Sequence, residues 1–326
     1  MRRFFEGKRI LVTGGTGSIG REIVHQLLKY EPEVIRIYSR NENNQFNFQQ
    51  ELGERRDVRF LLGDVRDKER LMRACDYIDV IFHAAALKHV PFCEYNPFEA
   101  VKTNILGAQN VIDVSIDQGV KKVIALSTDK AANPVNLYGA TKLCSDKLFI
   151  AGNAYVGSDR TVFSVVRYGN VVGSRGSVIP FFMERRKTAI LPITDPRMTR
   201  FWITIEQGVN FVLDSFARMV GGELFVPKLP SMNIMDLAKA IAPECCTEVT
   251  GIRPGEKLHE VMVPKDDARR TIELSDYYLI QPVFKFWGRR FIGEGTSSVP
   301  EDFEYNSGTN PWRLGIEEMR EMIRNL

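Results

Sequence analysis

The stretch TGGTGSIG, Thr13 to Gly20, decides the fold. It comes directly after the apolar run RILV and directly before REIVHQLLKY, where apolar residues recur at helical spacing. Glycines spaced three apart permit a tight turn, close approach of the backbone to a pyrophosphate and close packing of helix on strand, and the helix N-terminus offers unpaired N–H groups. We therefore expect a strand, a dinucleotide-binding loop and a helix. The cofactor-binding candidates in this loop are Gly14, Thr16, Gly17, Ser18, Ile19 and Gly20.

Outward from this loop, apolar runs alternate with helical patterns as far as KKVIALST at 121–128. Strands separated by helices need crossover connections, so the order predicts an α/β fold with a Rossmann-like, doubly wound parallel sheet. The alternation fades after FSVVRYGNVVG, where we expect a smaller C-terminal substrate-binding domain. The predicted cofactor domain spans residues 1–172 and about 200–225, and the smaller domain spans about 173–199 and 226–326.

Composition excludes several classes of protein. The 44 basic and 41 acidic residues give a formal net charge of +3, which leaves no excess that would favour nucleic acid or an anionic membrane. No apolar run approaches the roughly 20 residues that span a bilayer, and we expect a cytoplasmic protein without a membrane partner. Five cysteines and four histidines lack metal-ligand spacing, so no metal site is expected.

The end of the second predicted strand, IYSRNE, selects the cofactor. An acidic residue there would bind the ribose hydroxyls of NAD, but Ser39 and Arg40 stand in its place. The Arg40 guanidinium suits a 2′-phosphate, so NADP is favoured over NAD. The alternative is that Arg40 is a solvated surface residue and Glu42 restores NAD binding. Further cofactor contacts are expected from Asp64, Val65, Ala84 and Ala85.

The segment STDKAANPVNLYGATK, residues 127–142, follows a buried strand whose carboxyl end faces the ligand crevice. Tyr138 precedes Lys142 by one helical turn, so both side chains point to one side. A nearby ammonium favours the phenolate, which makes Tyr138 a base that can take a hydroxyl proton as hydride leaves the same carbon. Thr128 is a hydroxyl partner for this pair. Such spacing also arises by chance on helix surfaces, and the glycine loop is what favours catalysis, with Tyr138 and Lys142 also contacting the cofactor.

Glycines three apart followed by this Tyr–Lys pair resemble the short-chain dehydrogenase/reductase superfamily. The segments AALKHVP, RYGNVVGSRGSVIPFF, DPRMTRFWIT and GIRPGEKLHEVM extend the resemblance up to about YYLIQP. They are similar to the extended members that act as UDP-N-acetylglucosamine 4,6-dehydratases of the C5-inverting type, which open pseudaminic acid biosynthesis for flagellin glycosylation. The resemblance implies UDP-N-acetylglucosamine as substrate, UDP-2-acetamido-2,6-dideoxy-β-L-arabino-hexos-4-ulose as product, and a homo-oligomer built from dimers, up to a hexamer.

Asp129 and Lys130 have no task in simple alcohol oxidation. Once C4 of a sugar is a ketone, a base can remove the acidic C5 proton while an acid protonates the departing C6 hydroxyl; hydride then returns to C6, and water is the net loss. Lys130 as C5 base and Asp129 as C6 acid suit this chemistry, but adjacent groups titrate together, so the roles are interchangeable and Tyr138 can take part. The alternative is that Asp129 caps a turn and Lys130 is solvated. By resemblance, Asp-Lys instead of Asp-Glu marks the inverting subfamily.

A UDP-sugar also needs donors for its diphosphate. Asn170, Arg200 and Arg253 are the candidates, and Pro254 and Gly255 fix a turn beside Arg253. Arg200 has a structural ion pair as its alternative. Substrate contacts are also expected from Glu256, for which a surface salt bridge is the alternative, and from Lys88 in AALKHVP.

Three other functions remain open from the sequence. A UDP-sugar C4 epimerase would use the glycine loop, Tyr138 and Lys142 but would leave Asp129 and Lys130 without a task. A retaining 4,6-dehydratase differs only in the face of C5 that is reprotonated, which depends on geometry. A non-enzymatic NADP sensor would not need both Tyr138 and Lys142.

Overall fold

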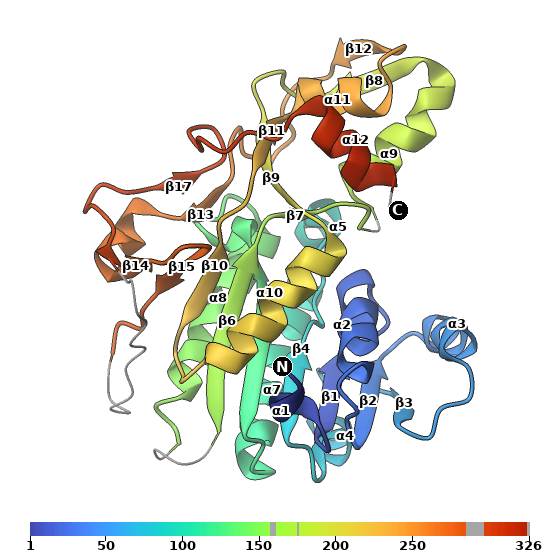
Figure 1. Cartoon of the computed structure of the whole chain (residues 1–326), viewed down its shortest axis with the longest axis vertical. Coiled ribbons are helices and arrows are strands. Elements are labelled where there is room, and N and C mark those ends of the chain that lie inside the picture. Colours follow the sequence, from blue (N-terminus) through green and yellow to red (C-terminus); the bar gives the residue numbers. More distant parts are fainter. Residues whose placement is uncertain (157–160, 175, 285–296, 325–326) are drawn as a thin grey trace.

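One large sheet of ten strands organises the computed structural model, which describes residues 1–156, 161–174, 176–284 and 297–324 (Figure 1). Neighbouring strands in the order β3-β2-β1-β4-β5-β6-β10 are parallel. Their bounds are β1 Arg9–Thr13, β2 Val34–Ser39, β3 Val58–Leu62, β4 Val80–His83, β5 Lys122–Thr128, β6 Val162–Tyr168 and β10 Leu224–Pro227. The order of the first six is that of a dinucleotide-binding sheet, so the predicted doubly wound fold is confirmed.

Helices connect these strands and cover both faces of the parallel region (Figure 1). In one layer α10 packs against α2, and in the other α7 packs against both α4 and α8. The bounds of the connecting helices are α2 Ser18–Leu28, α3 Glu42–Leu52, α4 Lys68–Cys75, α7 Gly107–Asp117, α8 Leu137–Gly152 and α10 Ile205–Arg218. The central strand β5 is buried from its second residue onward, as expected for a strand covered by helices on both faces.

The helical segment that precedes β5 is not regular. A short helix, α6 (Pro97–Val101), leads into a π-helical turn at Lys102–Leu106, and α7 begins only at Gly107. Within this turn the buried Asn104 amide bonds to both backbone groups of Leu87 and donates to the Thr141 hydroxyl on α8. These bonds attach the wider turn to Leu87 and to α8, and π-helical turns of this kind occur frequently at functional sites.

Antiparallel strands extend the sheet beyond β10. β15 (Tyr277–Ile280) pairs with β10, followed outward by β14 (Thr271–Glu273) and β16 (Ser297–Ser298). All three strands come from the range predicted for the smaller domain. That range therefore also contributes strands to the large sheet. The division into two domains stays a prediction. Residues 285–296, in the C-terminal stretch to which the sequence assigned no role, lie outside the described residues.

A second hydrophobic core lies beside the carboxyl end of the large sheet (Figure 1). It contains Trp202 and Phe182, both buried, together with Leu237 and Met319. The elements around it are β7 Asn170–Val171, α9 Val178–Arg185, β8 Ile190–Ile193, β9 Thr199–Ile203, β11 Ser231–Asn233, α11 Ile234–Ile241, β12 Cys246–Val249 and α12 Ile316–Arg324. Two further pieces, β13 (Val261–Val263) and β17 (Tyr305–Asn306), pair with each other next to the pocket described below.

Candidate active site

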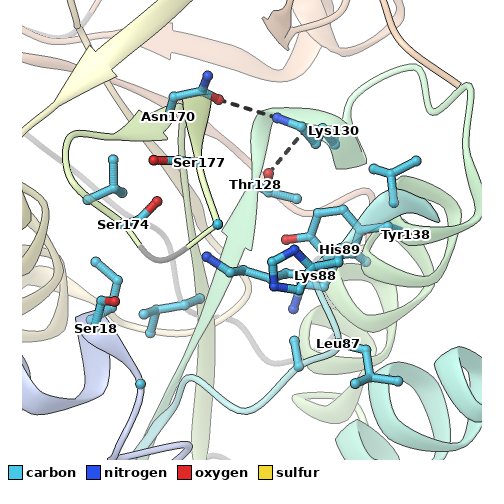
Figure 2. A pocket seen from close by; sticks show the side chains of 18 of the residues that line it. Ser18, Leu87, Lys88, His89, Thr128, Lys130, Tyr138, Asn170, Ser174 and Ser177 are labelled. Atoms are coloured by element: carbon cyan, nitrogen blue, oxygen red, sulfur yellow. Dashed lines mark hydrogen bonds between the residues drawn. The ribbon is translucent and has the colours of Figure 1, made fainter. Parts of the chain in front are cut away.

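A pocket of about 1190 Å³ lies at the carboxyl ends of the parallel strands. It extends from the glycine loop past β5 to the loop formed by residues 253–257. Figure 2 shows its central part, where Thr128, Lys130 and Asn170 lie on one side, near Tyr138 and Lys88. The carboxyl edge of a doubly wound sheet is the usual ligand crevice, so the fold and the predicted site agree in position.

The glycine loop leaves no room for larger residues. Gly14 has a φ of +67°, and a Cβ built there would lie 2.7 Å from the Ala85 backbone nitrogen; a Cβ on Gly20 would lie 2.4 Å from the Gly14 oxygen. Helix α2 then begins at Ser18, after an N-cap glycine that leaves the first N–H groups available. This cradle fits a dinucleotide pyrophosphate. The predicted cofactor residues that line the pocket are Gly14, Thr16, Gly17, Ser18, Ile19, Gly20, Ser39, Arg40, Asp64, Val65, Ala84, Ala85, Tyr138 and Lys142.

Directly after β2, the positively charged Arg40 lies beside the predicted position of the adenosine ribose. The Arg40 side chain is 47% exposed, and its Nη1 lies 3.5 Å from Asp64 Oδ2, which is a weak contact that a phosphate can replace. The Ser39 hydroxyl accepts from Thr16 and from Gln45, and so its position is fixed. Arg40 therefore faces the pocket on a rigid strand end.

Tyr138 and Lys142 lie one turn apart on α8, both buried in the pocket wall. Asn136 caps this helix by accepting from the Gly139 amide at 2.8 Å. Burial raises the pKa of Tyr138 to about 12, although the Lys130 charge and the Thr128 hydroxyl act in the opposite direction. Burial also lowers the pKa of Lys142. The tyrosine thus needs neighbouring cations to become a phenolate.

Lys130 and Asp129 form an ion pair directly after β5. The Lys130 Nζ lies 3.0 Å from Asp129 Oδ1. It also donates to Asn170 Oδ1 at 3.3 Å, a contact drawn in Figure 2. Lys130 lines the pocket, whereas Asp129 is fully buried and is not among the described residues that line it. Burial alone would lower the pKa of Lys130, but the carboxylates of Asp129 and Glu260 outweigh that effect, and its pKa is raised. Lys130 is therefore an ammonium in the free site.

The predicted substrate residues all line the pocket, but they differ in what they can bind. Arg200 donates from Nη1 to the carbonyls of Thr199 and Leu258 and from Nη2 to that of Lys257, so its guanidinium braces the fold. Arg253 is 60% exposed, and within the described part of the chain its guanidinium has one ion-pair partner, the distant Glu256 at 4.0 Å. Arg253 is thus better placed than Arg200 to meet a diphosphate. Asn170 and Lys88 lie on the inner wall (Figure 2).

Two pocket residues, Lys257 and Glu260, were missed from the sequence. The Lys257 Nζ donates to the Ala132 carbonyl at 2.5 Å, next to the Asp129–Lys130 pair. Glu260 is 3% exposed, and its Oε1 lies 3.7 Å from Lys130 Nζ. Both belong to the quoted segment GIRPGEKLHEVM, and the available signal was that Lys257 and Glu260 are charged residues close to the apolar run VMV at 261–263.

His83, the last residue of β4, is buried. Its Nδ1 lies 2.8 Å from the Thr13 hydroxyl, and burial lowers its pKa to about 3, so the ring is neutral. Within the described ranges, no group of three or more His, Cys, Asp or Glu side chains is arranged to hold a metal ion. No helix in that part of the chain is long and apolar enough to cross a membrane.

Fold and pocket define a dinucleotide-binding α/β protein with a Tyr–Lys pair at the crevice. Residues 10–282 match the family described as polysaccharide biosynthesis protein. The chain is 53% identical over 330 residues to the UDP-N-acetylglucosamine 4,6-dehydratase (inverting) of Campylobacter jejuni strain 81-176, with 98% of each chain covered. It therefore belongs to the polysaccharide biosynthesis protein family, and the resemblance predicted from its sequence is confirmed.

Two further comparisons bear on function. The chain is 39% identical over 334 residues to the UDP-glucose 4-epimerase of Rickettsia conorii, which covers 99% of this chain and 97% of the epimerase. The X-ray structure of Pen from Bacillus thuringiensis superposes with a TM-score of 0.92 at 39% identity, covering 99% of this chain and 98% of Pen. Relatives with two different activities thus share the whole length of this chain.

Proposed function

We propose that this protein is a UDP-N-acetylglucosamine 4,6-dehydratase that inverts C5. The observation that carries the proposal is the ion pair of Lys130 with Asp129, whose lysine Nζ faces the pocket shared with Tyr138. The 53% identity to a dehydratase of that name supports it. The product would be UDP-2-acetamido-2,6-dideoxy-β-L-arabino-hexos-4-ulose.

The first step is oxidation at C4. Tyr138, as phenolate, takes the proton of the C4 hydroxyl, while the Lys142 ammonium supplies positive charge that stabilises the phenolate. A nicotinamide cofactor held by the glycine loop would supply hydride chemistry here, as acceptor for the C4 hydride and as its source for C6. The small residues Ala84 and Ala85 in the pocket wall allow the cofactor to approach.

The second step is loss of water across C5 and C6. Lys130 is the member of the pair that can contact the sugar, and it begins as an ammonium. In a concerted elimination the C5–H and C6–O bonds break together: Lys130 gives a proton to the leaving hydroxyl while its nitrogen takes the C5 proton, so that Lys130 ends with as many protons as it began. Asp129, behind it, stabilises the ammonium. This version combines the two roles that the sequence divided between Asp129 and Lys130; the direct role of Asp129 as acid stays a prediction.

Reduction at C6 and protonation at C5 complete the reaction. The hydride lost from C4 returns to C6, which becomes a methyl group, and C5 regains a proton from the opposite face. The balance is the loss of one water molecule from the nucleotide sugar. Inversion therefore needs a proton donor on the second face of C5, a role open to Tyr138 once it has taken the C4 proton.

The cofactor is proposed to be NADP. The glycine loop fits a pyrophosphate, and Arg40 at the end of β2 offers a guanidinium to a 2′-phosphate. For the sugar nucleotide, Arg253 at the pocket mouth and Asn170 on its wall are the proposed phosphate-side contacts, with Glu256 and Lys88 beside them. Arg200 is proposed to act by shaping the pocket, because its donors are engaged by carbonyls.

We also propose the setting that the resemblance implies. The product would enter pseudaminic acid biosynthesis and flagellin glycosylation, and the enzyme would work in the cytoplasm as a homo-oligomer. A UDP-sugar C4 epimerase is the second candidate function, because the Rickettsia conorii epimerase covers nearly the whole chain. An epimerase, however, gives no task to Lys130.

Proton NMR of the purified protein with UDP-N-acetylglucosamine in deuterated water, first without added cofactor and then with NADP, tests the proposal. The expected result is a new C6 methyl signal, deuterium at C5 and couplings of the L-arabino product. A methyl product with the original C5 configuration would mean a retaining dehydratase. Conversion to the galacto sugar would mean an epimerase, and no change with NADP present would reject both.

A further inference from the structure

Glu260 lies at the centre of a cluster of cations at the inner end of the pocket. Its Oε1 lies 3.7 Å from both Lys130 Nζ and Arg200 Nε, and its Oε2 lies 3.7 Å from Lys257 Nζ. The side chain is 3% exposed, and it lines the same pocket as Lys130. Three cations, from Lys130, Arg200 and Lys257, thus surround one buried carboxyl group.

The backbone of Glu260 is held firmly, whereas its carboxylate is not. The Glu260 N–H donates to the Ser307 hydroxyl at 2.9 Å, and the Ser307 N–H donates back to the Glu260 carbonyl at 2.8 Å. By contrast, Glu260 Oε2 has no hydrogen-bond partner among the described residues. An unpaired buried oxygen costs free energy, and such a group at a pocket wall points to a functional reason for keeping it.

We propose that Glu260 is a positioning residue: together with Asp129, its carboxylate holds the Lys130 ammonium at the pocket wall and so serves the elimination of water rather than the first oxidation. This inference rests on the proposed function. Asn170 accepts a hydrogen bond from Lys130 as well, so Asp129, Asn170 and Glu260 surround the lysine Nζ. With Glu260 removed, one of these three directions would be open and the ammonium could turn away from the sugar.

Removal of Glu260 also changes the charge that Lys130 senses. The ionisable groups that face Lys130 come from its own turn, from α8, from β9 and from the segment before β13: Asp129, Tyr138, Arg200, Lys257 and Glu260. The carboxylates raise the pKa of Lys130 and Arg200 lowers it. Loss of the Glu260 carboxylate therefore makes the net charge around Lys130 more positive. This lowers the pKa of Lys130, so that its ammonium would release a proton at lower pH.

Labelling of lysine amines at varied pH, with the labelled fraction measured by mass spectrometry, tests this without using the activity. Only the free amine reacts, so the labelling rate reports the proton on Lys130. For Glu260→Gln we expect Lys130 to be labelled roughly ten times faster than in the wild type at the same pH, since a nearby opposite charge shifts a pKa by about one or more. The matched control is Lys228, whose side chain is 25% exposed and which pairs with Glu273 at 2.7 Å outside the pocket. Glu273→Gln should change labelling of Lys228 by less than about threefold, because exposed pairs are weak.

Activity supplies the second test. With UDP-N-acetylglucosamine, Glu260→Gln should slow formation of the C6 methyl product roughly tenfold or more while leaving single-turnover reduction of the cofactor within about threefold of the wild type. The limb of the pH profile that reports Lys130 should move down by about one pH unit, and Glu260→Asp, which keeps the charge, should move it back.

The outcomes separate the inference from the function on which it rests. Unchanged labelling of Lys130 in Glu260→Gln overturns the inference, as does an equal loss of oxidation and elimination that Glu260→Asp does not restore. If the wild type forms no methyl product, the proposed function fails, and the labelling result still decides whether Glu260 controls Lys130. Should Glu260→Gln not fold, Glu260→Asp decides: labelling and pH profile close to the wild type support the electrostatic role, and a loss of both steps together rejects it.

Discussion

Asn136 joins the catalytic helix to Gly255 in the loop that carries Arg253. The Asn136 Oδ1 accepts from the Gly139 amide at 2.8 Å and caps α8, while its Nδ2 donates to the Gly255 carbonyl at 2.7 Å. A second bond, from Lys257 Nζ to the Ala132 carbonyl, joins the same two segments. The loop that carries Arg253, which is proposed to contact the diphosphate, is thus attached to the segment that carries Lys130 and Tyr138, the proposed proton-transfer groups.

We predict that Asn136→Ala weakens both helix capping and substrate binding. Loss of an N-cap costs about 0.5–2 kcal/mol of folding free energy, and release of the Gly255 carbonyl should raise KM for the UDP-sugar severalfold. Urea unfolding and initial-rate kinetics measure the two effects. Thr204→Ala is the matched control, since Thr204 caps α10 outside the pocket. It should lose similar stability with an unchanged KM, and equal KM values for the two variants would contradict the prediction.

Lys130→Ala and Tyr138→Phe should block different steps. Because Tyr138 is proposed to take the C4 proton, Tyr138→Phe should abolish cofactor reduction in a single turnover. Lys130→Ala should still reduce the cofactor but lose roughly a hundredfold or more in methyl formation, the usual contribution of a general acid or base. Stopped-flow absorbance of the reduced cofactor and NMR of the product measure the two steps. Normal turnover by Lys130→Ala would remove the role assigned to that lysine.

The first oxidation should become faster as the pH rises. Burial raises the pKa of Tyr138 to about 12, so the reactive phenolate is a minor form at neutral pH, and its fraction grows with pH. We expect the rate of cofactor reduction to rise between about pH 6 and about pH 9, approaching tenfold per pH unit where proton loss limits the step. A rate that is flat over this range, measured under single-turnover conditions, would mean that the bound state already holds the phenolate.

Much of the fold and of the candidate site could be predicted from the sequence, because short sequence patterns indicate them. The glycine loop, the alternation of strands and helices, and the Tyr138–Lys142 spacing are all patterns within a few turns of chain. The extension of the sheet by β14 and β15 could not be predicted in the same way, since antiparallel pairing with β10 depends on tertiary packing. The π-helical turn before α7 likewise depends on Asn104 reaching Leu87 and Thr141.

At the candidate site, the cluster of charges around Glu260 could likewise not be predicted from the sequence. Lys130 and Glu260 are far apart in the sequence, and only the folded chain brings their side chains to 3.7 Å. The burial of Asp129 behind Lys130 also depends on tertiary packing, because the sequence does not show which of two adjacent charged residues is exposed. Residue types could indicate acid–base chemistry at this site, but not which group meets the sugar.

Arg40 should decide between the two nicotinamide cofactors. Charge-assisted hydrogen bonds contribute about 1.5–3 kcal/mol, so Arg40→Ala should weaken NADP binding roughly tenfold to a hundredfold and leave NAD binding within about threefold. Titration calorimetry with both cofactors measures the change. Arg55→Ala is a suitable control, because Arg55 pairs with Asp57 away from the pocket. Equal losses for NADP and NAD in Arg40→Ala would argue against 2′-phosphate recognition.

Gly139→Ala should disturb the site through packing alone. A Cβ at Gly139 would lie 2.1 Å from the Lys130 carbonyl oxygen, so α8 and the turn after β5 would have to separate. We expect a loss of about 1–3 kcal/mol of folding free energy and a loss of activity larger than stability explains, because Lys130 and Tyr138 would move apart.

Gly208→Ala on α10 provides the comparison. Its added Cβ would meet only Ile203 Cδ1, at 3.8 Å, so the change should stabilise the protein by up to about 1 kcal/mol through helix propensity. Urea unfolding of both variants, with kinetics of the folded fraction, tests the pair. The prediction is contradicted if Gly139→Ala keeps wild-type stability and activity. The close approach of α8 to Lys130 would then not be what fixes the distance between Tyr138 and Lys130.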